Sequence, residues 1–370
     1  MGWNSWNTFG AEIHEDLIKE TADCLVESGL RDCGYDYLVI DDCWSLRERD
    51  AQDRLVADPV KFPHGMKALA DYVHGKGLKF GMYSCAGNLT CAGYPGSFEH
   101  EFIDAATFAE WGVDFLKYDY CYHSPIIPGE ILYRRMGLAL ENCGRDILFS
   151  GCSWGADETH EWIKTTSASM WRSTGDIFDT WESIKDLTKQ QARLLPFNGV
   201  GCFNDMDMLV VGMRGKGNVG LQGCSDIQYR THFSIWAFMG SPLMIGCDIR
   251  STTPEIKEIL TNKELLAINQ DIACRQPYPL KGIWQNEDTV KYAKSLSNGD
   301  IALGFFNMNK EKTTVRLNLD ELGLPHSTGK TLDMTEIWTG KKAHIANAHL
   351  VWDLEPYDCA IFRAKVVDRA

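Results

Sequence analysis

The stretch "GVDFLKYDYCYHS", from Gly112 to Ser124, begins as an apolar run and ends in charged and aromatic residues. Side chains of a strand alternate between its two faces, so Lys117, Asp119 and Cys121 fall on one face and the tyrosines on the other. A solvated sheet edge is the simplest explanation of such a pattern. The rest of the chain decides whether this face instead meets a ligand at the end of a buried strand.

Short β-type runs of this kind alternate with helical segments up to about residue 275. Strands separated by helices indicate parallel βαβ units, and eight of them match a (β/α)₈ barrel, which takes about 250 residues. A doubly wound open sheet is the alternative, but no GxGxxG turn follows the first run. The predicted strands are residues 2–6, 37–42, 79–84, 114–120, 147–152, 169–175, 201–209 and 243–247, and the predicted helices are 15–29, 66–75, 98–111, 129–143, 179–195 and 228–239.

Beyond residue 275 the pattern changes to strand-like stretches such as "DTVKYAKSL" and "DIALGFFNM", separated by Asn-Gly, charged and Gly-rich turns. Hardly any helical periodicity remains there. This pattern is typical of an antiparallel β-sandwich. We therefore predict two domains, a barrel over residues 1–275 and an antiparallel β domain over 276–370.

Composition excludes several kinds of partner. The 370 residues are 44% hydrophobic and carry a net charge of −14, which disfavours nucleic acid and anionic membranes as main partners. No apolar run approaches the ~20 residues of a membrane helix. No signal peptide is recognisable, so we expect a cytoplasmic protein, or a secreted one if a leader was trimmed. A homo-oligomer stays open.

Cysteines and tryptophans are both informative. Thirteen cysteines without close CxxC pairs indicate mostly reduced, buried thiols rather than a zinc site. Several of the twelve tryptophans adjoin acids and amides, as in "WNSWN" and "DDCW". This mixture is suited to gripping sugar rings by stacking and by hydrogen bonds to hydroxyls.

Polar residues gather where the predicted strands end, which is where barrel enzymes place their active sites. Acidic residues end four of the strands. At one mouth of the barrel their negative charges would repel each other unless a ligand or cation were bound between them. The residues at these ends include Asp41, Asp42, Tyr83, Lys117, Asp119, Ser153, Arg172, Asp176 and Asp207.

Three chemistries could use such a mouth. Carboxylates could hold Mg²⁺ or Ca²⁺, Lys117 could form a Schiff base, or two acids could cleave a glycosidic bond. The aldolase ranks lowest because Asp119 on the same face stabilises charged Lys117. A metal site is disfavoured because these ends carry no His and are surrounded by Trp and Tyr. Sugar chemistry is favoured.

Six motifs carry a resemblance to a known family: "MGWNSW", "YLVIDDCW", "FGMYS…TCAGYPGS", "FLKYDYCY", "MWRSTGDIFDTW" and "NDMDML". In order and spacing they resemble family 27 of the glycoside hydrolases, which contains α-galactosidases and α-N-acetylgalactosaminidases. The resemblance extends over the whole chain, including the C-terminal β domain. It implies a retaining double displacement on terminal α-linked galactose-type sugars of glycans, with neither metal nor other cofactor.

The resemblance also implies roles for single residues. Asp119 matches the nucleophile and Asp176 the acid/base, while Cys91 and Cys121 match a disulfide pair that lines the pocket. Cysteine partners of other family disulfides are replaced here, which leaves Cys43 and Cys152 free. Positions that match sugar contacts are Trp6, Asp41, Asp42, Tyr83, Lys117, Arg172 and Asp207.

The stretch "GCSWGADE" bears on which terminal sugar the protein prefers. Ser153 and Ala156 are the same small pair that the resemblance assigns to N-acetylgalactosaminidases, where they would accommodate an acetamido group. We therefore predict removal of terminal α-linked N-acetylgalactosamine, with α-galactosidase activity as the alternative. A β-L-arabinopyranosidase and a non-catalytic carbohydrate-binding relative are less favoured. Ser153 could also be a small packing residue.

Overall fold

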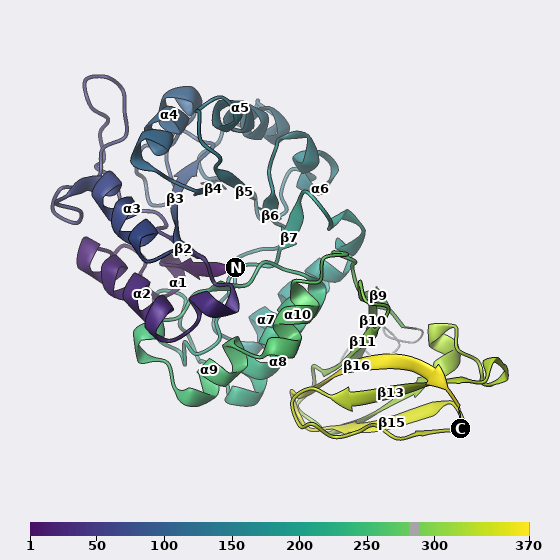
Figure 1. The fold of residues 1–370 in the computed structure, drawn as a ribbon. Coiled ribbons are helices and arrows are strands. Elements are labelled where there is room, and N and C mark those ends of the chain that lie inside the picture. The colour runs from purple at the N-terminus through teal and green to yellow at the C-terminus, as the bar shows by residue number, and fades with distance from the viewer. Residues whose placement is uncertain (281–288, 370) are drawn as a thin grey trace. The chain divides into compact units, whose positions relative to one another are not determined.

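Eight parallel strands form the barrel in the computed structural model, which describes residues 1–280 and 289–369 (Figure 1). Neighbouring strands pair in the order β7-β6-β5-β4-β3-β2-β1-β8, and a parallel bridge between Leu209 and Ile245 joins the two ends. The predicted (β/α)₈ architecture is confirmed. The strands are β1 (Gly2–Asn4), β2 (Tyr37–Val39), β3 (Lys79–Cys85), β4 (Phe115–Asp119), β5 (Leu148–Cys152), β6 (Met170–Arg172), β7 (Phe203–Asp205) and β8 (Met244–Ile245).

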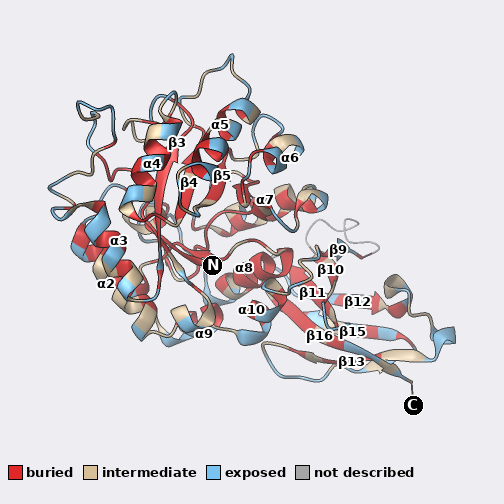
Figure 2. Cartoon of the chain, turned by 45° about the horizontal axis from the view of Figure 1, so that its top comes forward, coloured by how far each residue is buried: buried red, intermediate tan, exposed pale blue. Residues whose placement is uncertain are grey.

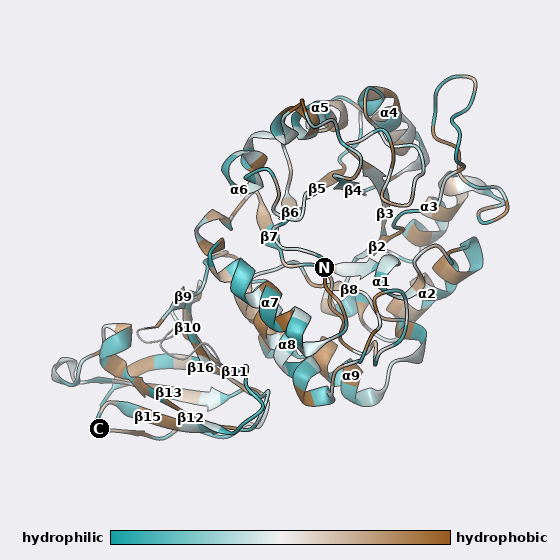
Figure 3. Ribbon diagram, turned by 180° about the vertical axis from the view of Figure 1, so that it is seen from behind, coloured by the Kyte–Doolittle hydropathy of each residue, from teal (hydrophilic) through white to brown (hydrophobic). Residues whose placement is uncertain are grey.

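Helices between the strands present an apolar face to the sheet. In α7, Trp181, Ile184 and Leu187 are buried at helical spacing, and polar positions lie between them (Figure 3). The helix begins where the Thr180 side chain accepts a hydrogen bond from the Ser183 amide. The helices of this part are α1 (Trp6–Phe9), α2 (Glu15–Glu27), α3 (Gly65–Gly75), α4 (Glu101–Trp111), α5 (Gly129–Glu141), α6 (Thr159–Trp162) and α7 (Trp181–Ala192).

Side chains fill the interior of the barrel. Val39, Phe115 and Met170 lie in one buried cluster with Met208 and Met244. The strand ribbons are accordingly buried over most of their length (Figure 2). A packed barrel offers a ligand only its two ends.

Several strands end earlier than the sequence predicts. Strand β2 ends at Val39 and β7 at Asp205, so Asp41 and Asp207 lie in the loops that follow. At Asp207 the backbone turns into the left-handed region, with φ of 81°, and cannot continue a strand. These short strands leave their polar residues on turns at the mouth of the barrel.

The C-terminal part forms two antiparallel sheets, in the orders β13-β16-β11-β10-β9 and β12-β15-β14. Leu303, Leu317 and Phe362 belong to one buried cluster that joins the sheets, and the rings of Trp352 and Phe362 pack edge to face. The predicted β-sandwich is confirmed, although Asp288 of the predicted strand 288–296 lies outside the described residues. The strands are β9 (Tyr278–Pro279), β10 (Thr289–Ser295), β11 (Ile301–Asn307), β12 (Thr313–Asn318), β13 (Lys330–Glu336), β14 (Ile345–Ala346), β15 (His349–Leu354) and β16 (Cys359–Asp368).

By spatial contact the chain divides into two units, Met1–Cys224 with Pro242–Lys257 and Ser225–Ser241 with Glu258–Ala370. Helix α8 (Asp226–Met239) falls in the second unit because it packs on β11, where Phe238 meets Phe306. The domain boundary at residue 275 stays a prediction. Two further helices are α9 (Pro254–Leu260) and α10 (Lys263–Asn269). Among the described residues, no helix combines the length and apolar character needed to cross a membrane.

Candidate active site

A cavity of about 280 Å³ lies at the C-terminal ends of the barrel strands. Ligand pockets usually measure about 300–1,000 Å³, so this one suits a single sugar ring rather than an extended chain. All the sequence-predicted site residues line it except Ser153 and Ala156. Those lining it are Trp6, Asp41, Asp42, Tyr83, Cys91, Lys117, Asp119, Cys121, Arg172, Asp176 and Asp207.

Strand β4 brings Lys117 and Asp119 to the cavity on one face, as the alternation predicts. The Lys117 ammonium donates to Asp41 Oδ2 at 2.8 Å, and Tyr83 Oη donates to Asp119 Oδ2 at 3.0 Å. The other Asp119 oxygen accepts the Tyr120 amide at 2.9 Å. Asp119 is only 5% exposed, so these contacts fix its carboxylate at the floor of the cavity.

Asp41 and Asp42 lie in the turn after β2, and backbone and side-chain donors hold both. Asp41 Oδ2 accepts Asn4 Nδ2 at 2.8 Å as well as Lys117. Asp42 Oδ2 accepts the Ala92 amide at 2.9 Å. Two adjacent, oriented carboxylates form an acceptor pair for two hydroxyls of one sugar.

Arg172, the last residue of β6, lies between two acids. Its guanidinium contacts Asp176 Oδ1 at 2.9 Å and Asp207 Oδ1 at 3.1 Å. The two partners differ in exposure, since the side chain of Asp176 is 65% exposed and that of Asp207 only 5%. Asp176 therefore reaches the rim of the cavity, whereas Asp119 and Asp207 lie inside.

The acids of the mouth have shifted pKa values. Burial raises the pKa of Asp119 to about 6, and the charge of Lys117 only partly offsets this. For Asp176, partial desolvation is outweighed by the charge and hydrogen bond of Arg172, so its pKa is lowered. Burial opposes the charge of Lys117, but Asp41 outweighs it and raises the pKa of Lys117. Lys117 therefore stays cationic beside Asp119.

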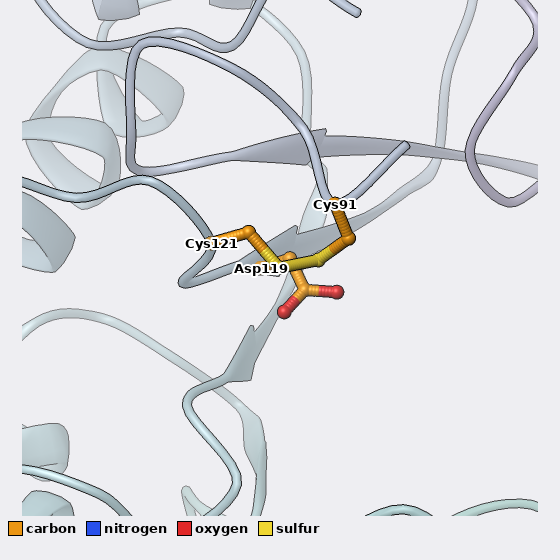
Figure 4. A group of neighbouring side chains, drawn as sticks. All are labelled: Cys91, Asp119 and Cys121. Carbon is orange, nitrogen blue, oxygen red and sulfur yellow. A yellow bond between two sulfur atoms is a disulfide. The ribbon is translucent and has the colours of Figure 1, made fainter. Parts of the chain in front are cut away.

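Cys91 and Cys121 form a disulfide whose Cα atoms are 5.1 Å apart, as the resemblance implied (Figure 4). The bridge adjoins Asp119, and Tyr83 Oη lies 3.4 Å from Cys91 Sγ. The grouping of two sulfurs and a carboxylate offers no thiolate to a metal, because both sulfurs are bonded to each other. It acts instead as a rigid wall. Cys43 is free, as expected.

Two residues that line the cavity each carry a buried donor with no hydrogen-bond partner among residues 1–280 and 289–369. These are Asn7 Nδ2 and Arg172 Nε. Both residues are less than 5% exposed. A buried donor without an acceptor costs free energy.

Ser153 and Ala156 are not among the residues that line the cavity. The Ser153 hydroxyl is buried and bonds Thr159 Oγ1 at 2.7 Å, so it holds the loop after β5 together. Ala156 is exposed, and its carbonyl accepts a hydrogen bond from Thr159. The neighbouring Trp154 lines the cavity instead. The packing explanation of Ser153 thus agrees with its contacts.

Besides Trp154, which the sequence already placed at the end of the fifth strand, the cavity has lining residues that sequence reasoning missed: Asn7, Ile177, Phe178, Met208, Asn218 and Val219. Asn218 and Val219 come from the Gly-rich segment "GMRGKGNVG" after β7. A glycine-rich loop that follows a barrel strand could have drawn attention to them, since such loops build the site in this fold.

The arrangement matches a known family. Residues 1–271 match the family described as "Alpha galactosidase A", and residues 286–364 match "Alpha galactosidase C-terminal beta sandwich domain". The chain belongs to the α-galactosidase A family, family 27 of the glycoside hydrolases. It is a glycoside hydrolase, and the family resemblance of its motifs is confirmed.

Relatives of this family resemble the chain over nearly its full length. An α-galactosidase of Cyamopsis tetragonoloba is 40% identical over 98% of this chain and 85% of the relative. The structure of α-galactosidase I from Mortierella vinacea is 33% identical, with a TM-score of 0.91 over 100% of this chain and 97% of the other. That of a Saccharomyces cerevisiae α-galactosidase with raffinose is 29% identical, with a TM-score of 0.87 over 99% and 97%.

Proposed function

We propose that the protein is an exo-acting, retaining α-galactosidase that removes terminal α-linked galactose from glycans. The observation that carries this proposal is the small cavity with Asp119 at its floor and Asp176 at its rim. A cavity of this size accepts one terminal ring, and its two acids can serve the two roles of a retaining enzyme. The relatives reported above are named α-galactosidases.

In the first step Asp119 attacks the anomeric carbon while Asp176 donates a proton to the leaving oxygen. In the second step Asp176 takes a proton from a water molecule whose oxygen attacks the anomeric carbon, the bond to Asp119 breaks, and the sugar leaves with its original anomeric configuration. Lys117 and Arg172 keep positive charge beside the reacting acids. Tyr83 holds the attacking carboxylate in place through its hydrogen bond to Oδ2.

Galactose is proposed as the preferred sugar in place of N-acetylgalactosamine. The acetamido preference depended on Ser153 and Ala156, and neither residue lines the cavity. The Ser153 hydroxyl is already bonded to Thr159, so it has less capacity to bind an amide. The family resemblance assigns Asp41 and Asp42 to the hydroxyls at carbons 4 and 6, which favours a hexose over the pentose arabinose.

The test is a comparison of kcat/KM on three nitrophenyl glycosides: α-galactoside, α-N-acetylgalactosaminide and β-L-arabinopyranoside. We expect the α-galactoside to be preferred by at least about tenfold, because one clash or lost contact is worth about 1–3 kcal/mol. A higher value on the N-acetylgalactosaminide would reverse the proposed sugar preference. Inactivity on all three would overturn the proposed function.

A further inference from the structure

The turn after β7 contains a backbone conformation that a side chain stabilises. Asp207 has a φ of 81°, in the left-handed region that most residues other than glycine avoid. A non-glycine residue keeps this conformation only where its surroundings hold it. Here Asp205, the last residue of β7, supplies that support, because its Oδ1 accepts the Asp207 amide at 2.9 Å. A bond from an Asp side chain to the backbone two residues further on makes an Asx turn.

Asp205 is buried, and a buried carboxyl group costs free energy. Burial raises its pKa to about 6, although the charge of Arg172 opposes this shift. Asp205 pairs with Arg172 in the parallel sheet, and its carbonyl accepts the Ser173 amide at 2.9 Å. The strand thus fixes the backbone of Asp205, and the turn gives its costly carboxyl group a defined role.

Asp207 connects this turn to the acid at the rim of the cavity. Its Oδ1 contacts the Arg172 guanidinium at 3.1 Å, and its Oδ2 accepts the Ile177 amide at 2.8 Å. Arg172 in turn contacts Asp176 Oδ1 at 2.9 Å, and Ile177 directly follows Asp176 in the chain. The carboxylate of Asp207 therefore holds Asp176 through its side-chain partner and through its backbone.

We infer that Asp205 is a positioning residue for Asp176 and acts through the turn at Asp207. This inference rests on the proposed function, in which Asp176 protonates the leaving oxygen. Without the acceptor at Asp205, the Asp207 backbone loses the bond that favours its left-handed conformation. The Asp207 carboxylate then shifts relative to Arg172 and the Ile177 amide, and the proton donor shifts with them. A small displacement of a catalytic group is enough to slow a reaction strongly.

The test measures how kcat/KM depends on the leaving group. The sugar that leaves raffinose needs protonation, whereas the dinitrophenolate that leaves a dinitrophenyl α-galactoside needs little. Asp205→Ala should lower kcat/KM about 10²-fold on raffinose and no more than about tenfold on the dinitrophenyl galactoside, because a displaced acid mainly impairs proton transfer. The ratio of the two values does not depend on the fraction of folded protein. A loss of stability alone would therefore leave this ratio unchanged.

Two further variants separate the turn from the charge. Asp205→Asn keeps a side-chain oxygen that can accept the Asp207 amide and removes the negative charge. It should keep the ratio within about twofold of the wild type, because the turn is retained. If Asp205→Ala does not fold, Asp205→Ser takes its place. A serine makes a weaker form of the same turn, so this variant should shift the ratio in the same direction by at least about threefold.

Asn307 offers a matched control in the C-terminal β domain. It is the last residue of β11 and is buried, and its Oδ1 accepts the Asn309 amide at 3.1 Å. Asn307→Ala removes the same kind of turn without a bond to the residues of the cavity. It should lower the free energy of unfolding in urea denaturation and leave the ratio of the two kcat/KM values unchanged.

The remaining outcomes distinguish this inference from the proposed function. An unchanged ratio in Asp205→Ala, or in Asp205→Ser where the alanine variant does not fold, would overturn the inference alone. The same holds if Asp205→Asn shifts the ratio as much as Asp205→Ala, or if Asn307→Ala shifts it as well. A wild type that hydrolyses neither raffinose nor the dinitrophenyl galactoside would overturn the proposed function and this inference with it.

Discussion

The two ends of the barrel differ in how their acidic residues are paired, and the volumes of the two hollows do not reveal this difference. The hollow at the N-terminal ends of the strands measures about 700 Å³ and exceeds the 280 Å³ cavity at the mouth. Its central acid, Asp114, is bound by His74 Nε2 at 2.7 Å, by the Phe80 amide at 2.8 Å and by Arg145. Burial opposes ionisation of Asp114, but these partners outweigh it and lower its pKa.

At the mouth the balance is reversed. The pKa of Asp119 is raised to about 6 because burial outweighs its partners. The partners of Asp114 therefore stabilise its ionised form and the fold, whereas the ionised form of Asp119 at the mouth is held at a cost. The electrostatic state of its groups, not the size of the hollow, locates the site.

The largest expected effect is at the floor of the mouth. Asp119→Asn should lower kcat/KM on nitrophenyl α-galactoside by at least about 10⁴-fold, because the amide cannot attack the anomeric carbon. The variant should melt at or above the wild-type temperature at pH 7, since its buried charge is costly. Retained activity in a folded Asp119→Asn protein would contradict the catalytic role of Asp119, on which the comparison of the two ends depends.

Replacement of Asp176, the acid at the rim, should lower kcat/KM strongly and by an amount that depends on the substrate. Asp176→Ala should lower kcat/KM about 10²–10⁴-fold on raffinose and less on a dinitrophenyl galactoside, whose leaving group needs little protonation. Added azide should restore turnover and yield α-galactosyl azide, detectable by NMR, because it attacks the glycosyl-enzyme from the face that the leaving group vacated. An intact fold with no azide product would remove Asp176 from the acid/base role.

The slope of kcat/KM against pH near pH 6 should have opposite signs in the wild type and in Asp176→Ala. Catalysis needs one proton shared by Asp119 and Asp176. Because the pKa of Asp176 is lowered, this proton resides mainly on Asp119 and is lost as the pH rises through about 6. Wild-type kcat/KM should therefore fall as pH rises through about 6. Asp176→Ala on the dinitrophenyl galactoside needs only ionised Asp119, so its rate should rise through the same range. Parallel profiles would contradict this account.

The smallest expected effect lies at the opposite end. Arg145→Ala removes one partner of Asp114 and the donor to the Val113 carbonyl. We expect a loss of about 1 kcal/mol in the free energy of unfolding, measured by urea denaturation, because the pair is partly exposed. The kcat/KM on nitrophenyl α-galactoside should stay within about twofold. A tenfold loss of activity without a loss of stability would show that the larger hollow takes part in function.

Much of this site was predictable from local pattern. Strand alternation placed Lys117 and Asp119 on one face, and the barrel rule placed that face at the mouth. Both inferences need only short-range geometry and the order of elements along the chain.

The sequence could not predict contacts that depend on how distant loops meet. Ser153 looks free in sequence, yet its hydroxyl is occupied by Thr159. Phe178 and Asn218 line the same cavity, and the backbones of their neighbours Asp179 and Val219 pair between the two loops. The number of residues between such partners varies freely, so no spacing reveals them.

The most direct test of the account is to trap the covalent intermediate. A fluorinated galactosyl inactivator should react once per chain, and peptide mass spectrometry should find the adduct on Asp119. The labelled protein should recover activity as the adduct hydrolyses, and excess galactose should slow the labelling. An adduct on Asp176, Asp207 or any acid outside the mouth would contradict the assignment of Asp119 as the nucleophile.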